Sequence, residues 1–145
     1  MNTKPFFSSV KQTWKTPKLL YEKLDKEFKF KFDPCPTNAD FDGLKLKNWF
    51  KCNFVNPPHK TQNLWIWKAI DEMRKGKKTV MLLPARTDTK IFHEHILPFA
   101  YEIRFIKGRL HYDEHKNSAL FPSMIVIFNG MQICHGAYIE SYDYR

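Results

Sequence analysis

The sequence predicts a single-domain α/β fold with a partly parallel sheet, and three observations support this prediction. Short apolar runs alternate with segments of helical spacing over the first two thirds of the chain. Strand-like runs follow one another near the end, which favours antiparallel strands there. The length of 145 residues suffices for one hydrophobic core, and no repeat or linker divides it. We therefore expect a loose arm over residues 1–10 and one domain over residues 11–145.

Three segments have the apolar spacing of helices. Leucines on one face, after a proline suited to an opening turn, predict a helix from Pro17 to Glu27. A second apolar stripe predicts a helix from Gln62 to Lys75, with Gly76 as its stop. A shorter helix is expected from Ile91 to Leu97.

Seven segments are expected to form strands. The alternation of Phe with Lys predicts the first, and the nearly continuous apolar run of Thr79–Leu83 is typical of a strand covered on both faces. The polar stretch from Thr37 to Lys51 predicts irregular structure, with at most a turn around Asp40 to Gly43. The expected strands are Phe28–Phe32, Cys52–Val55, Thr79–Leu83, Glu102–Ile106, Arg109–Tyr112, Met124–Phe128 and Gln132–Tyr138.

Composition narrows the class of partner. Lys and Arg number 24 against 15 Asp and Glu, a formal charge of +9, and such a surface attracts polyanions, nucleic acid first. No apolar run is long enough to span a membrane and no signal peptide is present, so we expect a soluble intracellular protein without a membrane partner. The three cysteines form no CxxC pair and the histidines lack companions at ligand spacing, so neither a disulfide nor a metal site is expected.

Three loops that follow expected strands are rich in polar groups. They are Asp33-Pro34-Cys35-Pro36, Asn56-Pro57-Pro58-His59 and the loop from Pro84 to Thr89. Ligands of open α/β sheets bind beyond the carboxyl ends of the strands, so these loops are the places to search for a site.

The loop at Asn56 has the clearest chemistry. Its prolines fix the backbone, so the Pro57 carbonyl and the Asn56 side-chain oxygen can converge on the exocyclic amino group of a base. The His59 ring could stack on that base. The alternative is a structural one, a strand followed by a proline turn that leads into a helix.

Six blocks of sequence together resemble the phage-type DNA N6-adenine methyltransferases over about residues 12 to 129. The resemblance implies S-adenosylmethionine as cofactor and a methyltransferase-like mixed sheet flanked by helices. This sheet is compressed, because only 22 residues (34 to 55) separate Asp33 from Asn56, with no GxGxxG between them. The blocks are Thr13-Trp-Lys-Thr-Pro17, Phe32-Asp-Pro-Cys35, Asn53-Phe-Val-Asn-Pro-Pro58, Met81-Leu-Leu-Pro-Ala-Arg-Thr-Asp-Thr89, Ile103-Arg-Phe-Ile-Lys-Gly-Arg109 and Phe121-Pro-Ser-Met124.

The resemblance also implies roles for individual residues. The family's catalytic Asp/Asn-Pro-Pro-Tyr/Phe motif falls on Asn56, Pro57, Pro58 and His59, and its cofactor-binding segments fall on Thr16, Pro17, Asp33, Pro34, Cys35, Asn48 and Trp49. Two positions depart from the pattern. His59 replaces the usual Tyr or Phe, and Asn48 stands where an aspartate is common.

The expected function is methyl transfer from S-adenosylmethionine to N6 of adenine in DNA, with the target base flipped out or single-stranded. Arg86 and Thr87 are expected to contact nucleic acid, and Asp88 or Thr89 to cap the helix after them. Lys107 and Arg109 are expected to flank a hairpin turn and to contact phosphates. We expect a phage-encoded protein acting in the host cytoplasm, either monomer or homodimer. The alternatives are a binding protein that has lost turnover, and a methyltransferase acting on RNA or a protein amide.

Overall fold

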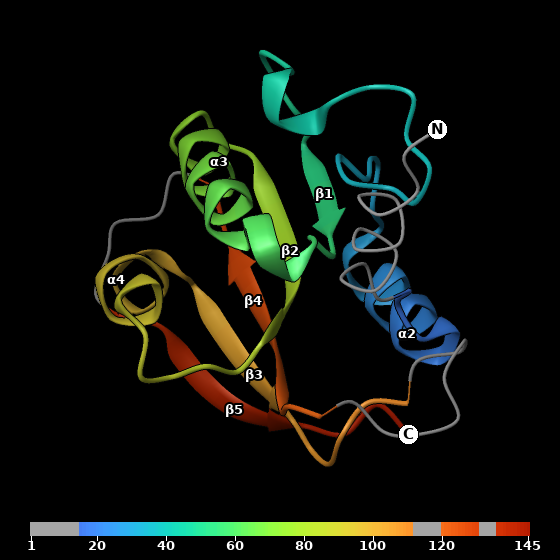
Figure 1. The fold of residues 1–145 in the computed structure, drawn as a ribbon, viewed down its shortest axis with the longest axis vertical. Helices are drawn as coiled ribbons and strands as arrows, with labels where there is room; N and C mark the ends of the chain where they lie inside the picture. Colours follow the sequence, from blue (N-terminus) through green and yellow to red (C-terminus); the bar gives the residue numbers. More distant parts are fainter. Residues whose placement is uncertain (1–14, 112–119, 131–135) are drawn as a thin grey trace, which may run out of the picture.

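The computed structural model describes residues 15–111, 120–130 and 136–145, and in them five strands form one mixed sheet (Figure 1). The strands are β1 (Cys52–Val55), β2 (Lys78–Pro84), β3 (Glu102–Ile106), β4 (Ser123–Phe128) and β5 (Tyr138–Tyr142), in the order β1-β2-β4-β3-β5. β1 runs parallel to β2 and β5 parallel to β3, whereas β4 is antiparallel to both of its neighbours. The predicted α/β class and the partly parallel sheet are confirmed.

Helices cover both faces of the sheet (Figure 1). α2 (Lys18–Phe28) packs on one face, against Val80 and Leu82 of β2. α3 (Gln62–Arg74) packs on the other, against Met81 and Leu83, together with the short helical segment Phe92–Ile96 and α4 (Leu97–Phe99). Alternate residues of β2 pack into the cores on opposite faces of the sheet, which explains its unbroken apolar run. The prediction of a strand covered on both faces is confirmed.

Helix boundaries follow the local signals in the sequence. α2 begins after Pro17 and ends where Lys29 adopts a left-handed conformation, with φ of 56°. α3 ends at Arg74, and Gly76 (φ 90°) turns the chain towards β2. Both helices lie within one residue of the predicted ranges. Within the described residues, no helix has the length and apolar character needed to cross a membrane.

The predicted strand Phe28–Phe32 is wrong. Phe28 is the last residue of α2, and Phe32 forms a single parallel bridge to Asn53. The rings of Phe28 and Phe30 stack with centroids 6.0 Å apart, and Phe30 also packs on Phe54 of β1 at 5.2 Å. Aromatic packing, not strand pairing, therefore explains the alternation in this segment. The expected compression is confirmed, since one 3-10 turn (Gly43–Lys45) is the regular structure between Phe32 and β1.

The predicted strand Arg109–Tyr112 is also wrong over its described residues, because Arg109, Leu110 and His111 form no strand. The chain turns at Gly108 (φ 76°), and the Arg145 guanidinium donates hydrogen bonds of 2.8 Å to the carbonyls of Lys107 and Arg109. A side chain thus occupies acceptors that a hairpin partner would use. Residues 1–10, Tyr112 and residues 132–135 of the last expected strand lie outside the described residues. Gly136 and Ala137 form no strand, so only Tyr138 of that expectation falls in β5, which runs on to Tyr142.

Candidate functional site

β1 and β2 both run towards the lower edge of the sheet in Figure 1, and loops follow them and the segment that ends at Phe32. Phe32 pairs in parallel with Asn53, and Val55 at the end of β1 pairs in parallel with Met81 of β2. Since these segments run in the same direction, their carboxyl ends lie side by side. The loops that follow them begin at Asp33, Asn56 and Ala85. The three loops therefore follow parallel segments at one edge of the sheet, which is where we expect a site from the sequence.

Asn56 is tied to the start of α2. Its Nδ2 donates a 2.9 Å hydrogen bond to Oγ1 of Thr16, which directly precedes Pro17. Because the amide is planar, this bond also fixes the direction of its carbonyl oxygen. Pro57 is buried, and Pro58 leads into a 3-10 turn that begins at His59. One predicted cofactor residue and the predicted catalytic loop are thus brought together.

The His59 ring lies beside Phe121, with ring centroids 4.9 Å apart in an edge-to-face arrangement. The Phe121 ring also contacts Arg86, whose guanidinium carbon lies 5.8 Å from the ring centroid. Burial first, and then the nearby Arg86 charge, lower the pKa of His59 below its ordinary value. The imidazole is therefore neutral near pH 7, which suits a stacking ring.

Phe121 is a site residue that sequence reasoning missed. The segment that carries it is held beside β2, because Ala85 donates a 2.8 Å backbone hydrogen bond to the Pro122 carbonyl and Pro84 pairs with Ser123. The run Phe121-Pro-Ser-Met124, one of the six blocks that resemble the family, pointed to this segment but not to a site residue in it. Its contact with His59 depends on the pairing of β2 with β4, which the sequence pattern does not specify.

Asp33 is a half-buried carboxylate in the first loop. Its Oδ1 accepts a 2.8 Å hydrogen bond from the Cys35 backbone N–H, and among the described residues no ion pair neutralises it. Burial raises the pKa of Asp33 to about 6, against the opposing effect of that hydrogen bond. Burial, followed by the Asp33 charge, raises the pKa of Cys35 to about 12. Cys35 is thus an unreactive thiol, and Asp33 is well suited to pair with a cationic group of a ligand.

The Asp33-Pro34 loop rests on Gly43. A Cβ at Gly43 would lie 1.9 Å from the Pro34 carbonyl oxygen, so only glycine fits there without a shift. The Gly43 carbonyl in turn accepts a 2.9 Å hydrogen bond from Nε1 of buried Trp49, whose ring stacks on Trp65. Trp49 therefore supports the loop through Gly43.

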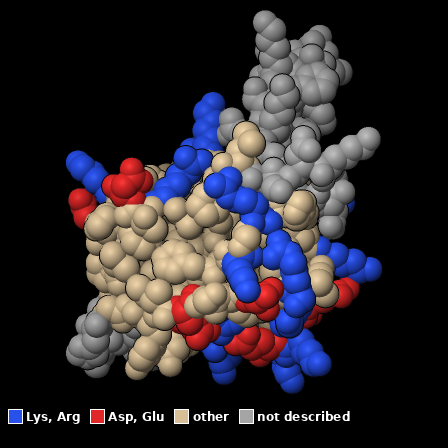
Figure 2. Space-filling view, turned by 90° about the horizontal axis from the view of Figure 1, so that it is seen from below, with Lys and Arg blue, Asp and Glu red and all other residues tan. Residues whose placement is uncertain are grey.

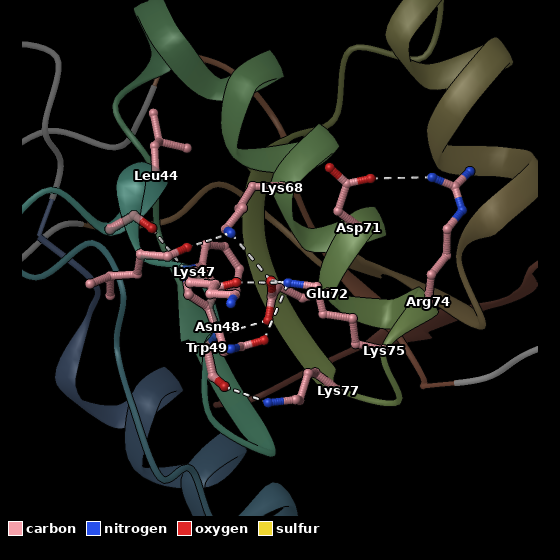
Figure 3. Close-up of polar contacts among 12 residues, drawn as sticks. Leu44, Lys47, Asn48, Trp49, Lys68, Asp71, Glu72, Arg74, Lys75 and Lys77 are labelled. Atoms are coloured by element: carbon pink, nitrogen blue, oxygen red, sulfur yellow. Dashed lines mark hydrogen bonds and ion pairs between the residues drawn. The ribbon is translucent and has the colours of Figure 1, made fainter.

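A buried carboxylate on α3 holds the segment around Trp49 (Figure 3). Glu72, which is fully buried, accepts a 2.7 Å hydrogen bond from the Trp49 backbone N–H and pairs with Lys68 (3.2 Å) and Lys75 (2.7 Å). Burial would raise its pKa, but the bonds from Lys75, Trp49 and Lys68 together lower it. Glu72 therefore stays ionised and anchors the segment to α3.

Asn48 lies apart from the other predicted site residues. It is exposed, and its Oδ1 is 3.4 Å from the Lys75 ammonium beyond the end of α3. This position lies before β1 begins, whereas Asn56 lies just after β1 ends. The expected contact of Asn48 with a cofactor thus remains a prediction that the geometry does not support.

The predicted nucleic-acid residues occupy two places. Arg86 and Thr87 are exposed in the loop after β2, where Thr89 accepts a 3.3 Å hydrogen bond from Phe92 N–H and caps the segment after it, as expected. Lys107 and Arg109 are exposed in the turn after β3, which ends at the same edge as β1 and β2. Viewed from below, this face carries Lys and Arg, interspersed with Asp and Glu, beside a broad uncharged surface (Figure 2).

Comparisons with known proteins give a solved structure and a family that match the chain. One solved structure that matches is a predicted O-methyltransferase from Agrobacterium tumefaciens, at 19% identity and a TM-score of 0.40, over 65% of this chain and 41% of that one. No curated protein matches the chain. The DNA N-6-adenine-methyltransferase (Dam) family matches residues 4–141, a range that contains all three loops. By this match over nearly its whole length, the chain belongs to the DNA N-6-adenine-methyltransferase (Dam) family.

Proposed function

We propose that this protein transfers a methyl group from S-adenosylmethionine to N6 of adenine in DNA. The family supports the chemistry. The observation that carries the proposal is that Asp33, Asn56 and Arg86 lie on loops that follow three neighbouring segments running in the same direction. A carboxylate, an amide and a guanidinium are the groups needed to bind an ammonium, an amine and a phosphate.

The residues around Asp33 fit the methionine end of the cofactor, which supplies an electrophilic methyl group when bound. Asp33 would accept charge-assisted hydrogen bonds from the cofactor's ammonium, the cation that its buried carboxylate lacks among the described residues. Thr16 and Pro17 would line the same side, since Thr16 is hydrogen-bonded to Asn56. The neutral thiol of Cys35 would not compete as a nucleophile.

The loop after β1 would bind the target amine. The Asn56 oxygen and the Pro57 carbonyl would accept its two N–H groups, which favours a pyramidal nitrogen and stabilises positive charge as it develops. No strong base is required, because the proton can leave after transfer. The neutral His59 ring would stack on the adenine, and Arg86 would contact a phosphate beside the flipped nucleotide.

Methyl transfer from tritiated S-adenosylmethionine to unmodified DNA, with identification of the modified base, tests the proposal. Asn56→Ala should lower turnover by 10- to 1000-fold, roughly 1–4 kcal/mol, with cofactor affinity little changed. Asn63→Ala, an exposed Asn on α3, is the matched control and should retain activity. Full turnover in a folded Asn56→Ala variant would refute the role of Asn56, and methylation of RNA or protein instead of DNA would refute the substrate.

A further inference from the structure

A cavity lies where β1 and β2 begin and β4 ends. These strand ends are at the top of the sheet in Figure 1. Its volume is about 380 Å³, within the range of roughly 300–1,000 Å³ that is usual for small-ligand sites. β1 is four residues long, so at about 3.3 Å per residue roughly 13 Å separate this end of the strand from Asn56. The cavity is therefore distinct from the three loops of the candidate methyl-transfer site.

Four lysines line this cavity, and no carboxylate does. Lys29 and Lys31 follow α2, Lys51 precedes β1, and Lys78 is the first residue of β2. Segments distant in the sequence thus place four cations around one hollow, which we call the lysine cavity. Like charges gathered in this way repel one another, and a bound anion would relieve that repulsion.

The lysines of the cavity differ from three other cations among the described residues, which are paired. Lys68, Lys75 and Arg104 each pair with a glutamate. Within the described residues, by contrast, no ion pair is formed by the ammonium groups of Lys29, Lys31, Lys51 or Lys78. The Lys78 ammonium instead lies 5.7 Å from the ring centroid of Phe28, on the cavity wall.

Two glycines contribute backbone to the cavity lining. Gly76, after α3, touches Gly130, after β4, so closely that a Cβ at Gly130 would lie 2.3 Å from the Gly76 carbonyl oxygen. Two loops are thus packed together without side chains between them. This leaves the lysine ammonium groups as the cationic ligands that the cavity offers.

We propose that the lysine cavity binds phosphate groups at a site separate from methyl transfer. Four lysine ammoniums suit a compact multivalent anion, to which each ammonium donates in a different direction. The phosphates belong either to the backbone of bound DNA or to a free phosphorylated ligand of nucleotide size. Neither source requires that the protein transfer methyl groups.

The test compares two double variants of equal net charge. Lys31→Gln/Lys51→Gln removes two cavity lysines, and Lys45→Gln/Lys47→Gln removes two exposed lysines that do not line it. All four side chains are exposed, so both variants should fold, which thermal unfolding checks. Binding of pyrophosphate is measured by calorimetry and binding of a 20-base-pair duplex by fluorescence anisotropy, both at low salt. The cavity variant should bind phosphate at least tenfold more weakly than the control variant.

The two ligands distinguish the sources. If the cavity variant binds the duplex more weakly than the control variant does, the cavity is assigned to the DNA backbone, whether or not pyrophosphate binding also falls. A loss confined to pyrophosphate assigns it to a free phosphorylated ligand. If neither ligand distinguishes the two variants, the proposal is overturned. Methyl transfer by both variants at saturating DNA reports separately on the proposed activity.

Discussion

Neutral His59 is the residue whose charge state should control activity at mildly acidic pH. Burial and the Arg86 charge lower the pKa of His59. The ring therefore stays neutral at pH values somewhat below about 6.5, the ordinary pKa of histidine. Protonation would place a positive charge beside an amine that is itself becoming cationic. We expect turnover of the parent to fall only at a pH below 6.5, and His59→Tyr to lack this fall.

A pH–rate profile at saturating cofactor checks this expectation. Other groups titrate in both proteins, so their effects cancel when the two profiles are divided. Identical profiles for parent and Tyr variant would show that the His59 charge plays no part. His59→Ala should cost about 1–3 kcal/mol of base binding in the same assay, because stacking is lost.

We expect the Asp33 carboxylate to destabilise the cofactor-free protein at neutral pH and to strengthen cofactor binding. Its folded pKa, about 6, lies above the unfolded value near 3.9, so the folded state binds the proton more tightly. That contribution to stability is complete below pH 4 and is lost as the pH rises through 6. At pH 7, Asp33→Asn should therefore stabilise the cofactor-free protein by about 1–3 kcal/mol, since Asn still accepts the Cys35 N–H.

The same variant should bind S-adenosylmethionine several-fold more weakly, because it lacks the negative charge. Chemical denaturation at pH 4 and pH 7 measures the first effect, and calorimetry the second. Equal stability of parent and variant at pH 7, or undiminished cofactor affinity, would contradict this account.

The location of Asp33, Asn56 and Arg86 at one edge of the sheet could be predicted from the sequence. Each of them follows a segment that runs in the same direction. The same was not true of Phe121, which reaches His59 through the antiparallel pairing of β4 with β2. Nor did a family pattern show that Asn48 lies beside Lys75. Contacts set by strand register are visible only in the folded chain.

At the level of elements, the positions of β1 to β4 were predicted, whereas the exposed β5 was predicted only at its first residue. β1, β2 and β4 are mostly buried. Their continuous apolar runs are typical of strands and not of loops. The segment 28–32 has equal strand propensity, but its Phe side chains find partners on α2 and β1. Tertiary contacts therefore decided the outcome where local propensity was ambiguous.

The 3-10 turn at Gly43 should matter to cofactor binding although it is not expected to touch the cofactor. Gly43→Ala would force Pro34 away by steric overlap, which should shift Asp33 and weaken S-adenosylmethionine binding at least several-fold. Gly136→Ala is the control, because a Cβ there has no atom within 4 Å and meets only the strain of a φ of 91°. Calorimetry on both variants tests the difference. Comparable loss of affinity in both would show that general destabilisation is responsible.

For the whole molecule, the net charge of +9 is distributed over both ends of the sheet. The lysine cavity lies at the upper end, and Lys107, Arg109 and Arg145 are exposed after β3 and at the carboxyl terminus, at the lower end. Figure 2 shows cations on the lower face beside an uncharged surface. Under the proposed function, phosphates bound along such a face would place a flipped base near His59, so that charge and site would act on the same substrate.

This arrangement predicts how salt should affect DNA binding. Each phosphate neutralised by a cation adds about 0.9 to the slope of log affinity against log salt concentration. Lys107 is exposed, and its backbone N–H bonds to the Tyr142 carbonyl, so Lys107→Gln should leave the turn intact. We expect this variant to reduce the slope by about 0.9, and Lys45→Gln, with the same change in charge, to leave the slope unchanged. Anisotropy titrations from low to physiological salt measure both slopes. If Lys107→Gln retains the slope of the parent, Lys107 does not contact a DNA phosphate, and the contacts must come from other cations such as Arg109, Arg86 or those of the lysine cavity.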